Sequence, residues 1–397
     1  MAPSLLPIAL LFSALTSGSA LSFTNVTKVE TVPLAFGIAS ANAGSEVFVP
    51  GSYGSSSGVL ESFDGGVSYK MVDNVGVAVG AMILMTAAAN DDGATPSVVT
   101  GGLLGVGISN DNGATFAPLD LAKVVVTQDV KYEKLTSKLY GVSGTFNGAA
   151  GVAVSSDGGA SFTVKTIPSD LFVATLPRYA SYPSSTTFYV TAGMWNDTSA
   201  GTSTTTGSRR HHHAHHPSSR LSVAEDGSLH VHEVHQSAGD MAEDGAYPGW
   251  WGQVAKTTDG GETWALVFDD QTSGLYANDI HCSDENTCAF AMEGVGAPRI
   301  VSTTDGGATW NTFTDPSGAG MSLMAVRMTG PTEAWVAGGG DTGRVWHTTD
   351  LVNWEKYETA STDAISLISL AIGSDGKSAF ATGVLRSQLC SVLTIAI

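Results

Sequence analysis

The chain has 397 residues, of which 14% are charged and 47 are glycine, and its formal net charge is −19. An acidic surface of this size repels phosphate backbones and anionic headgroups, so we expect neither nucleic acid nor a membrane as a partner. The low charge content and abundant glycine favour a sheet-rich protein with many turns.

The chain begins with MAPSLLPIALLFSALTSGSA, an apolar run followed by small residues. This pattern predicts a secretory signal peptide over residues 1–20, although no Lys or Arg precedes the apolar run. NVT at Asn25 and NDT at Asn196 are N-glycosylation acceptors in a eukaryotic secretory pathway. We therefore expect a secreted or lumenal glycoprotein, and no later run of about 18 apolar residues predicts a membrane span.

A short form, Ser/Thr-x-Asp-x-Gly-x-Ser/Thr-aromatic, recurs along the chain. Its aspartates are separated by 47, 46, 102, 46 and 45 residues, and they are Asp64, Asp111, Asp157, Asp259, Asp305 and, in a degenerate copy that lacks the Gly, Asp350. A fixed period with one long gap indicates a repeat architecture. In such a turn Asp accepts backbone N–H bonds, Gly supplies a positive φ and the hydroxyls add local bonds. These residue types predict a structural role for the aspartates at β-hairpin corners.

The copies TTDGGETW at 257–264 and STTDGGATW at 302–310 resemble the Asp-box, or sialidase-type (BNR), repeat. That resemblance implies an all-β fold, the β-propeller, across nearly the whole mature chain. At about 46 residues per repeat the chain is most similar to the photosystem II assembly factor propellers. Sialidases, sortilin ectodomains and xyloglucanases carry the same box.

Each period divides into four short strands, with the Asp turn between the third and the fourth. Residues 21–397 without an insertion at 196–250 provide 46 residues for each of seven blades. The last segments supply three strands, and LSFTNVTKV after the signal peptide supplies a fourth. We therefore expect one domain over 21–397, a seven-bladed propeller of four-stranded antiparallel blades closed by its N-terminal strand. The insertion should overhang the mouth of the central channel from the fourth blade.

The insertion is rich in histidine. RRHHHAHHPSS at 209–219 precedes His230, His232 and His235, which are ligand types for zinc and copper. One interpretation is a metal-responsive lid in which these three residues converge with Glu225 or Glu233. The other is a solvated low-complexity loop with weak metal affinity and no gain in thermal stability, which is the outcome we expect. No other cofactor is predicted.

Aromatic and basic residues near the blade rims suggest ligand contacts. Trp250 and Trp251 either stack on a sugar or an apolar partner, or pack between sheets. Three arginines fall at comparable positions in the fifth, sixth and seventh blades, and they are Arg299, Arg344 and Arg386. If they converge, they form a site for a carboxylate or another anion, and coincidence is the alternative.

Cysteine spacing predicts one disulfide. Cys282 and Cys288 flank SDENT between two apolar strands, which suits a bridge across a hairpin in an oxidising compartment. The remaining cysteine, Cys390, is expected to be a buried apolar residue.

Enzymatic function requires more than the repeat. The candidate acids of a glycoside hydrolase are Glu293, Asp269, Asp270 and Asp341. Most such enzymes need two carboxyl groups flanking the bond, and sialidases carry Phe/Tyr-Arg-Ile-Pro near their start, whereas the first arginine here is Arg178. We therefore expect a monomeric, non-catalytic scaffold that binds a protein or carbohydrate, with an Asp-box glycoside hydrolase as the alternative.

Overall fold

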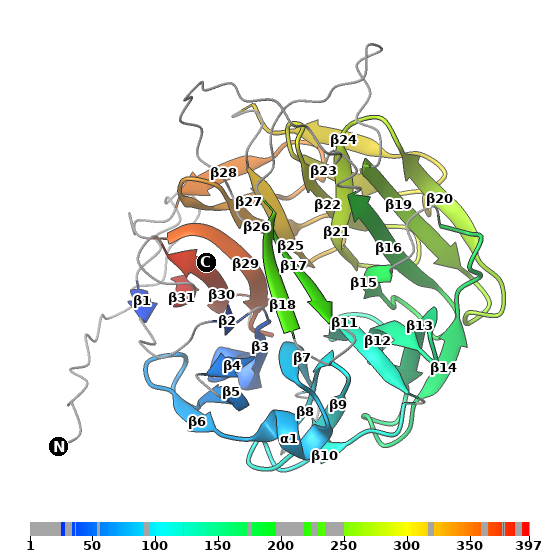
Figure 1. The fold of residues 1–397 in the computed structure, drawn as a ribbon. Coiled ribbons are helices and arrows are strands. Elements are labelled where there is room, and N and C mark those ends of the chain that lie inside the picture. Colours follow the sequence, from blue (N-terminus) through cyan, green and yellow to red (C-terminus); the bar gives the residue numbers. More distant parts are fainter. Residues whose placement is uncertain are drawn as a thin grey trace, which may run out of the picture.

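The computed structural model describes part of the chain, namely residues 25–27, 34–35, 37–53, 56–90, 96–121, 123–172, 177–195, 218–223, 229–234, 250–316, 321–358, 364–374, 376, 378–385 and 391–396. Within these residues the fold is almost entirely antiparallel β (Figure 1). The described part contains no helix long and apolar enough to cross a membrane. The predicted signal peptide, Asn196 and Cys390 lie outside the described residues.

The strands form four-stranded units, which we call blades, arranged radially in Figure 1. Two blades are separate sheets: β15 (Pro177–Ser181), β16 (Phe188–Trp195), β19 (Trp250–Thr257) and β20 (Ala265–Asp270), and then β21 (Leu275–Cys282), β22 (Cys288–Gly294), β23 (Arg299–Thr303) and β24 (Asn311–Thr314).

Two pairs of blades each share a larger sheet. The first pair consists of β7 (Ile83–Asn90), β8 (Ser97–Leu103), β9 (Val106–Ser109) and β10 (Ala117–Pro118), joined to β11 (Val124–Tyr132), β12 (Tyr140–Phe146), β13 (Ala149–Ser155) and β14 (Thr163–Thr166). The second consists of β25 (Ser322–Met328), β26 (Ala334–Gly339), β27 (Gly343–Thr348) and β28 (Glu355–Glu358), joined to β29 (Ala364–Ile372), β30 (Ser378–Leu385), β31 (Ser391–Ala396) and β1 (Asn25–Thr27). In each pair the two blades are joined by one β-bridge, between Val126 and Leu103 in the first and between Gly339 and Ser366 in the second.

The chain ends meet in one sheet, because β1 pairs with β31 in antiparallel register. The following sheet has both β2 (Leu34–Ala35) and β3 (Ala39–Ala41) on β4 (Glu46–Tyr53), followed by β5 (Ser56–Ser62) and β6 (Lys70–Val72). A short 3-10 turn, η1 (Asn42–Gly44), follows β3, and a five-residue helix, α1 (Val75–Val79), connects β6 to β7. Within the insertion, β17 (Ser218–Val223) and β18 (Leu229–Val234) pair with each other.

The first strands of neighbouring blades contact one another around the centre. These contacts run from β3 through β7, β11, β15, β21, β25 and β29 and return to β3. Chain direction then places two kinds of connection on one face, the blade-to-blade connections and the turns between second and third strands. We call this the insertion face, because the insertion lies between β16 and β19. The Asp turns lie on the opposite, aspartate face.

The apolar core is divided among the spaces between blades. One cluster combines Tyr189 and Val254 with Leu275 and Phe290 of the next blade. Another combines Phe380 with Val47, and so joins blades from the two ends of the chain. Because each cluster needs two blades to bury it, a blade is stable only beside its neighbours.

The Asp turns have the same hydrogen bonds in several copies. Asp259 Oδ1 accepts from the Thr263 amide at 2.9 Å, Oδ2 accepts from the Thr263 hydroxyl at 2.6 Å, and Thr257 Oγ1 accepts from the Gly261 amide at 2.9 Å. Equivalent bonds surround Asp64, Asp111, Asp157 and Asp305. The turn at Asp350 differs, because Leu351 stands at a positive φ of 61° where the turn at Asp111 has Asn112 and the other turns have Gly. The aromatic that follows packs between sheets, as Trp310 does.

A β-bulge interrupts the first strand of each blade from β7 to β29. The register shifts lie at Leu84/Thr86, Thr127/Asp129, Pro177/Ala180, Ala277/Ile280, Leu323/Ala325 and Leu367/Ser369. A bulge leaves a residue without its ladder partner and turns side chains toward new neighbours. In β7, β11 and β21 polar side chains beside the bulge, Thr86, Asp129 and Asp279, accept from backbone amides of another blade.

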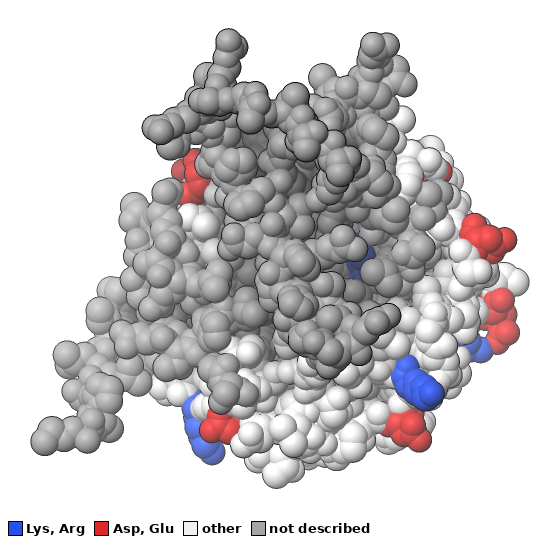
Figure 2. All heavy atoms as spheres, viewed as in Figure 1, with Lys and Arg blue, Asp and Glu red and all other residues white. Residues whose placement is uncertain are grey.

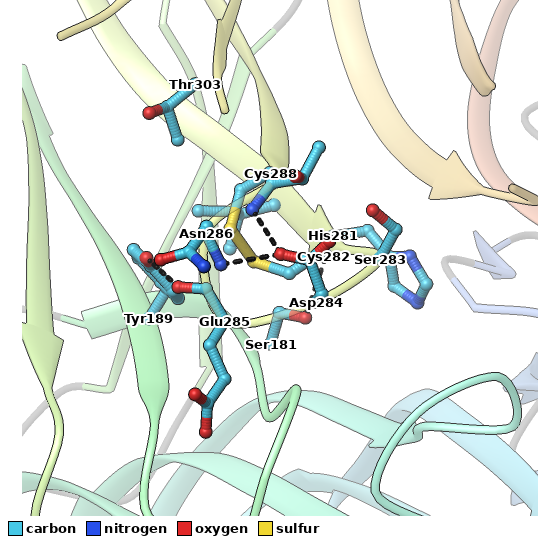
Figure 3. The surroundings of a disulfide bond; sticks show 12 residues. Ser181, Tyr189, His281, Cys282, Ser283, Asp284, Glu285, Asn286, Cys288 and Thr303 are labelled. Atoms are coloured by element: carbon cyan, nitrogen blue, oxygen red, sulfur yellow. Dashed lines mark hydrogen bonds between the residues drawn. A yellow bond between two sulfur atoms is a disulfide. The ribbon is translucent and has the colours of Figure 1, made fainter. Parts of the chain in front are cut away.

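The predicted disulfide between Cys282 and Cys288 is present and closes the β21–β22 hairpin (Figure 3). Both cysteines are fully buried. The loop between them contacts neighbouring blades, because Tyr189 Oη donates to the Glu285 carbonyl at 2.8 Å and Ser283 Oγ donates to the Pro331 carbonyl at 2.8 Å.

Candidate binding site

Three residues singled out in the sequence meet at one hollow on the insertion face. It has a volume of about 530 Å³ and is lined by Phe268, Asp269, Asp270, Gln271, Thr272, Arg299 and Thr312. Asp269 and Asp270 end β20, and Arg299 begins β23 of the next blade. Arg299 Nη1 lies 3.1 Å from Asp270 Oδ2 and joins the two blades across the hollow.

The hollow suits hydrogen bonding better than proton transfer. Burial alone would raise the pKa of Asp270, but hydrogen bonds from Ser273 and Thr272 and the charge of Arg299 hold this pKa below its ordinary value. Asp269 accepts from the Gln253 and Gln271 amides at 3.0 and 2.9 Å. A general acid at neutral pH needs a raised pKa, so Asp270 is unsuited to that role.

Glu293 lies elsewhere, opposite Tyr276 in the β21–β22 ladder. Burial and the Glu293 carboxylate raise the pKa of Tyr276, so the phenol keeps its proton and donates it in a hydrogen bond to Glu293 Oε1. The Arg178 guanidinium lies 4.5 Å from the centre of the Tyr276 ring. Glu293 is only 5% exposed, and among the described residues its Oε2 is buried without a hydrogen-bond partner.

The other predicted residues are in separate places. Arg344 is buried and pairs with Asp341 at 2.8 Å and Glu358 at 3.0 Å, in a different blade from Arg299. Trp251 is half-buried at the start of β19. The side chains of Trp250, His230 and His232, and all of Arg386 and His235, lie outside the described residues. Among the residues that are described, no group of His, Cys, Asp or Glu is arranged to hold a metal ion.

A buried charge network links four blades and was not predicted from the sequence. Lys131 Nζ donates to Asp279 Oδ1 at 2.5 Å and to the Ala180 carbonyl at 2.8 Å, and it also donates to the Ile280 carbonyl. Asp279 Oδ2 accepts from the Val326 amide at 3.0 Å and from Arg327. The Lys131 side chain therefore extends from β11 past the blade that begins with β15 to the blade that begins with β21.

Backbone amides beside the bulges complete this network. Thr86 accepts from the Val130 amide at 3.0 Å, and Asp129 accepts from the Ala180 amide at 3.3 Å. Asp279 likewise accepts from the Val326 amide, between the blades that begin with β21 and β25. Polar residues inside otherwise apolar strands, TQDVKYE and ANDIHC, were the available signal in the sequence. These contacts are structural, because they satisfy buried backbone groups.

Glu133 and His281 extend the network toward the aspartate face. Glu133 Oε1 accepts from Ser181 Oγ at 2.8 Å and from the Tyr182 amide at 2.6 Å, and His281 Nε2 lies 3.3 Å from Glu133 Oε2. His281 Nδ1 accepts from the Met328 amide at 3.0 Å, so the imidazole joins Glu133 to the backbone of β25.

Comparison with solved structures supports one fold. YCF48 from Cyanidioschyzon merolae is 12% identical, with a TM-score of 0.56 over 94% of this chain and 98% of that one. YCF48 bound to D1 peptide is 10% identical, with a TM-score of 0.56 over 96% of both chains. The WD40 β-propeller domain of Doa1 is 9% identical, with a TM-score of 0.53 over 94% of this chain and 96% of that one. The chain has a β-propeller fold.

At these identities the likeness establishes the fold of this propeller alone. No protein-family model and no curated protein sequence matches the chain. The predicted β-propeller fold is confirmed, and YCF48 is among the solved structures that share it.

Proposed function

We propose that this propeller is a non-catalytic scaffold that binds a protein partner on its insertion face. The proposal depends on the Asp270–Arg299 pair. The pKa of the Asp270 carboxyl is lowered, and its negative charge is balanced by the positive charge of Arg299. Such a pair exchanges hydrogen bonds with a ligand and does not transfer protons at neutral pH. YCF48, which has the same fold, has been seen with D1 peptide, which supports a protein ligand over a carbohydrate.

The proposal includes a particular architecture and location. The blades number seven and are closed by β1, which the unbroken series of first-strand contacts and the β1–β31 pairing support. The Asp turns are Asp boxes of the sialidase type. The chain is secreted as a monomer after cleavage near Ala20, and its histidine-rich insertion binds zinc or copper only weakly.

Face-specific blocking tests this function. A polyethylene glycol chain is attached to Thr272→Cys, at the hollow, or to Ser156→Cys, on the aspartate face, in a Cys390→Ser background. Proteins retained from the source organism by each conjugate are then compared by mass spectrometry. We expect the Thr272 conjugate to lose partners that the Ser156 conjugate keeps. Equal retention by both conjugates would remove the insertion face from the proposal.

The hydrolase alternative has its own readout. The purified chain is incubated with a glycan panel and reducing ends are measured. We expect no release, because the candidate acids Asp270 and Asp341 are held by arginines and Glu293 is bonded to Tyr276. Release that Glu293→Gln abolishes would replace the scaffold with an enzyme.

A further inference from the structure

Three apolar side chains from separate segments are exposed together on the insertion face. Met82 immediately precedes β7, Leu104 lies between β8 and β9, and Val125 is the second residue of β11. They are 43%, 47% and 44% exposed, respectively. Main-chain hydrogen bonds hold the segments side by side, from the Met82 amide to the Leu103 carbonyl at 2.9 Å and from the Leu104 amide to the Val125 carbonyl at 3.0 Å. We call Met82, Leu104 and Val125 the apolar patch.

The backbone under the patch is strained at Leu104. Its φ is +71°, in the left-handed region that favours glycine. The neighbouring Gly105 cannot take a larger side chain, because an added Cβ would lie 2.5 Å from the Val79 carbonyl oxygen. The corresponding turn of the next blade uses Asn147 and Gly148, residues that tolerate positive φ. Asn or Gly would adopt this backbone conformation at a lower free-energy cost than Leu104 does. The exposed Leu104 side chain contributes little to the core.

The charged residues near the apolar patch indicate which charge a ligand bound there should carry. The surface over α1 and β10, at the bottom of Figure 2, is drawn mostly white, although the net charge of the chain is −19. Lys123 lies two residues before Val125 and is exposed, and among the described residues no carboxylate pairs with it. An unpaired ammonium at the rim of an apolar surface complements one carboxylate on an otherwise apolar ligand. A second copy of this acidic chain is disfavoured by charge repulsion.

We infer that the apolar patch binds an extended apolar segment of a partner protein that carries one Asp or Glu side chain, with that carboxylate at Lys123. This inference rests on the proposed scaffold function and specifies the chemistry of the partner. The main-chain bonds beneath Met82 and Leu104 hold the surface in place before binding, so little ordering is needed when the segment docks.

A synthetic peptide array tests the inference with the full mature chain. Dodecapeptides alternate Leu with Thr, so that one side of an extended peptide is apolar. One Glu is placed at each position in turn, and matched series carry Gln or Lys there. Dissociation constants of the best binders are measured by fluorescence polarisation. We expect Glu peptides to bind best and Lys123→Gln to remove their advantage over Gln peptides.

The variants Leu104→Gly and Leu135→Ser form a matched pair. Leu135 is 58% exposed but lies outside the patch, in the connection between β11 and β12. We expect Leu104→Gly to weaken the Glu peptides about tenfold, the effect of losing one buried leucine, and Leu135→Ser to leave them unchanged. Leu104→Gly should also raise the melting temperature by about 1–3 °C, because glycine relieves the positive φ. Lost binding therefore cannot be ascribed to unfolding.

Several outcomes would overturn the inference. These are equal binding by Leu104→Gly, preference for Lys peptides, or binding that appears only after residues 196–249 are deleted, which would make the insertion the occupant. Concentration-dependent dimerisation that Leu104→Gly abolishes would make a second copy the occupant. If the Thr272 conjugate loses natural partners and Leu104→Gly keeps them, the patch is wrong and the scaffold function stands.

Discussion

Asp279 is the carboxylate on which Lys131 and Arg327 converge in the buried network. Burial would raise its pKa, but these two cations hold it below the ordinary value, whereas burial raises the pKa of Asp129 beside the same lysine. Asp279→Asn leaves both cations without a full partner, and we expect a loss of about 3–5 kcal/mol in the free energy of unfolding. Asp129→Asn retains an acceptor for the Ala180 amide and should cost about 1 kcal/mol. Urea unfolding at pH 7 measures both, and equal losses would contradict this assignment.

Titration of Glu61 should make the stability of the fold depend on pH in the opposite direction from titration of the aspartates in the Asp turns. It is 2% exposed in β5, and burial raises its pKa from 4.5 to about 7. The folded chain therefore keeps a proton that the unfolded chain releases, and stability falls as the pH rises from 4.5 through about 7. Glu61→Gln should remove this fall, so its melting temperature should gain on the wild type between pH 5 and pH 8.

The control for Glu61 is Asp259→Asn. Hydrogen bonds from Thr263 and Thr257 lower the pKa of Asp259 to about 2, so its contribution is present above the unfolded value of 3.8 and is lost as the pH falls toward 2. This variant should lower the melting temperature by a constant amount from pH 5 to pH 8. A Glu61→Gln profile parallel to the wild type over the same range would refute the role given to Glu61.

At the scale of elements, the β21–β22 hairpin is held by a covalent bond as well as by hydrogen bonds. Its disulfide closes a short loop that contacts Tyr189 and Pro331 in the two adjacent blades. Replacing Cys282 and Cys288 with Ala should cost about 2 kcal/mol, the chain-entropy value for a loop of this length. Differential scanning calorimetry of this variant and of Tyr189→Phe separates the crosslink from the contact. A disulfide variant as stable as the wild type would show that the blade contacts alone hold the loop.

Strands and turns were predictable to different degrees. The sequence predicted four short strands in each period, and β11 (Val124–Tyr132) is the first strand of one such unit, because apolar alternation between successive Asp turns marks these strands. It did not predict α1, since VGVAV is compatible with a strand, or the bulges, which depend on contacts with the next blade. The Asp270–Arg299 pair was missed for the same reason: both residues were named, but their contact crosses two blades.

At the scale of the whole molecule, the core lies between blades and not within them. Each apolar cluster is shared by neighbours, and the cluster of Phe380 with Val47 joins segments 333 positions apart. Burial of that cluster therefore requires contact between residues from the two ends of the chain. Long-range contacts of this kind carry a large loop-closure cost, so folding should be slow compared with that of helical proteins.

Removal of β1 tests how much the closure contributes. Deleting residues 22–29 leaves β31 without the partner that it has at three register positions, Asn25, Val26 and Thr27. We expect the free energy of unfolding to fall by about 1–3 kcal/mol, up to about 1 kcal/mol for each lost cross-strand pair. The exposed edge of β31 should also cause concentration-dependent association, because its unpaired backbone groups can pair with another chain.

Deleting residues 218–234 is the control: it removes β17 and β18, which pair only with each other among the described strands, and should change neither property. Size-exclusion chromatography and thermal melting measure both effects. A β1 deletion that stays monomeric and melts like the wild type would mean that this strand does not close the propeller.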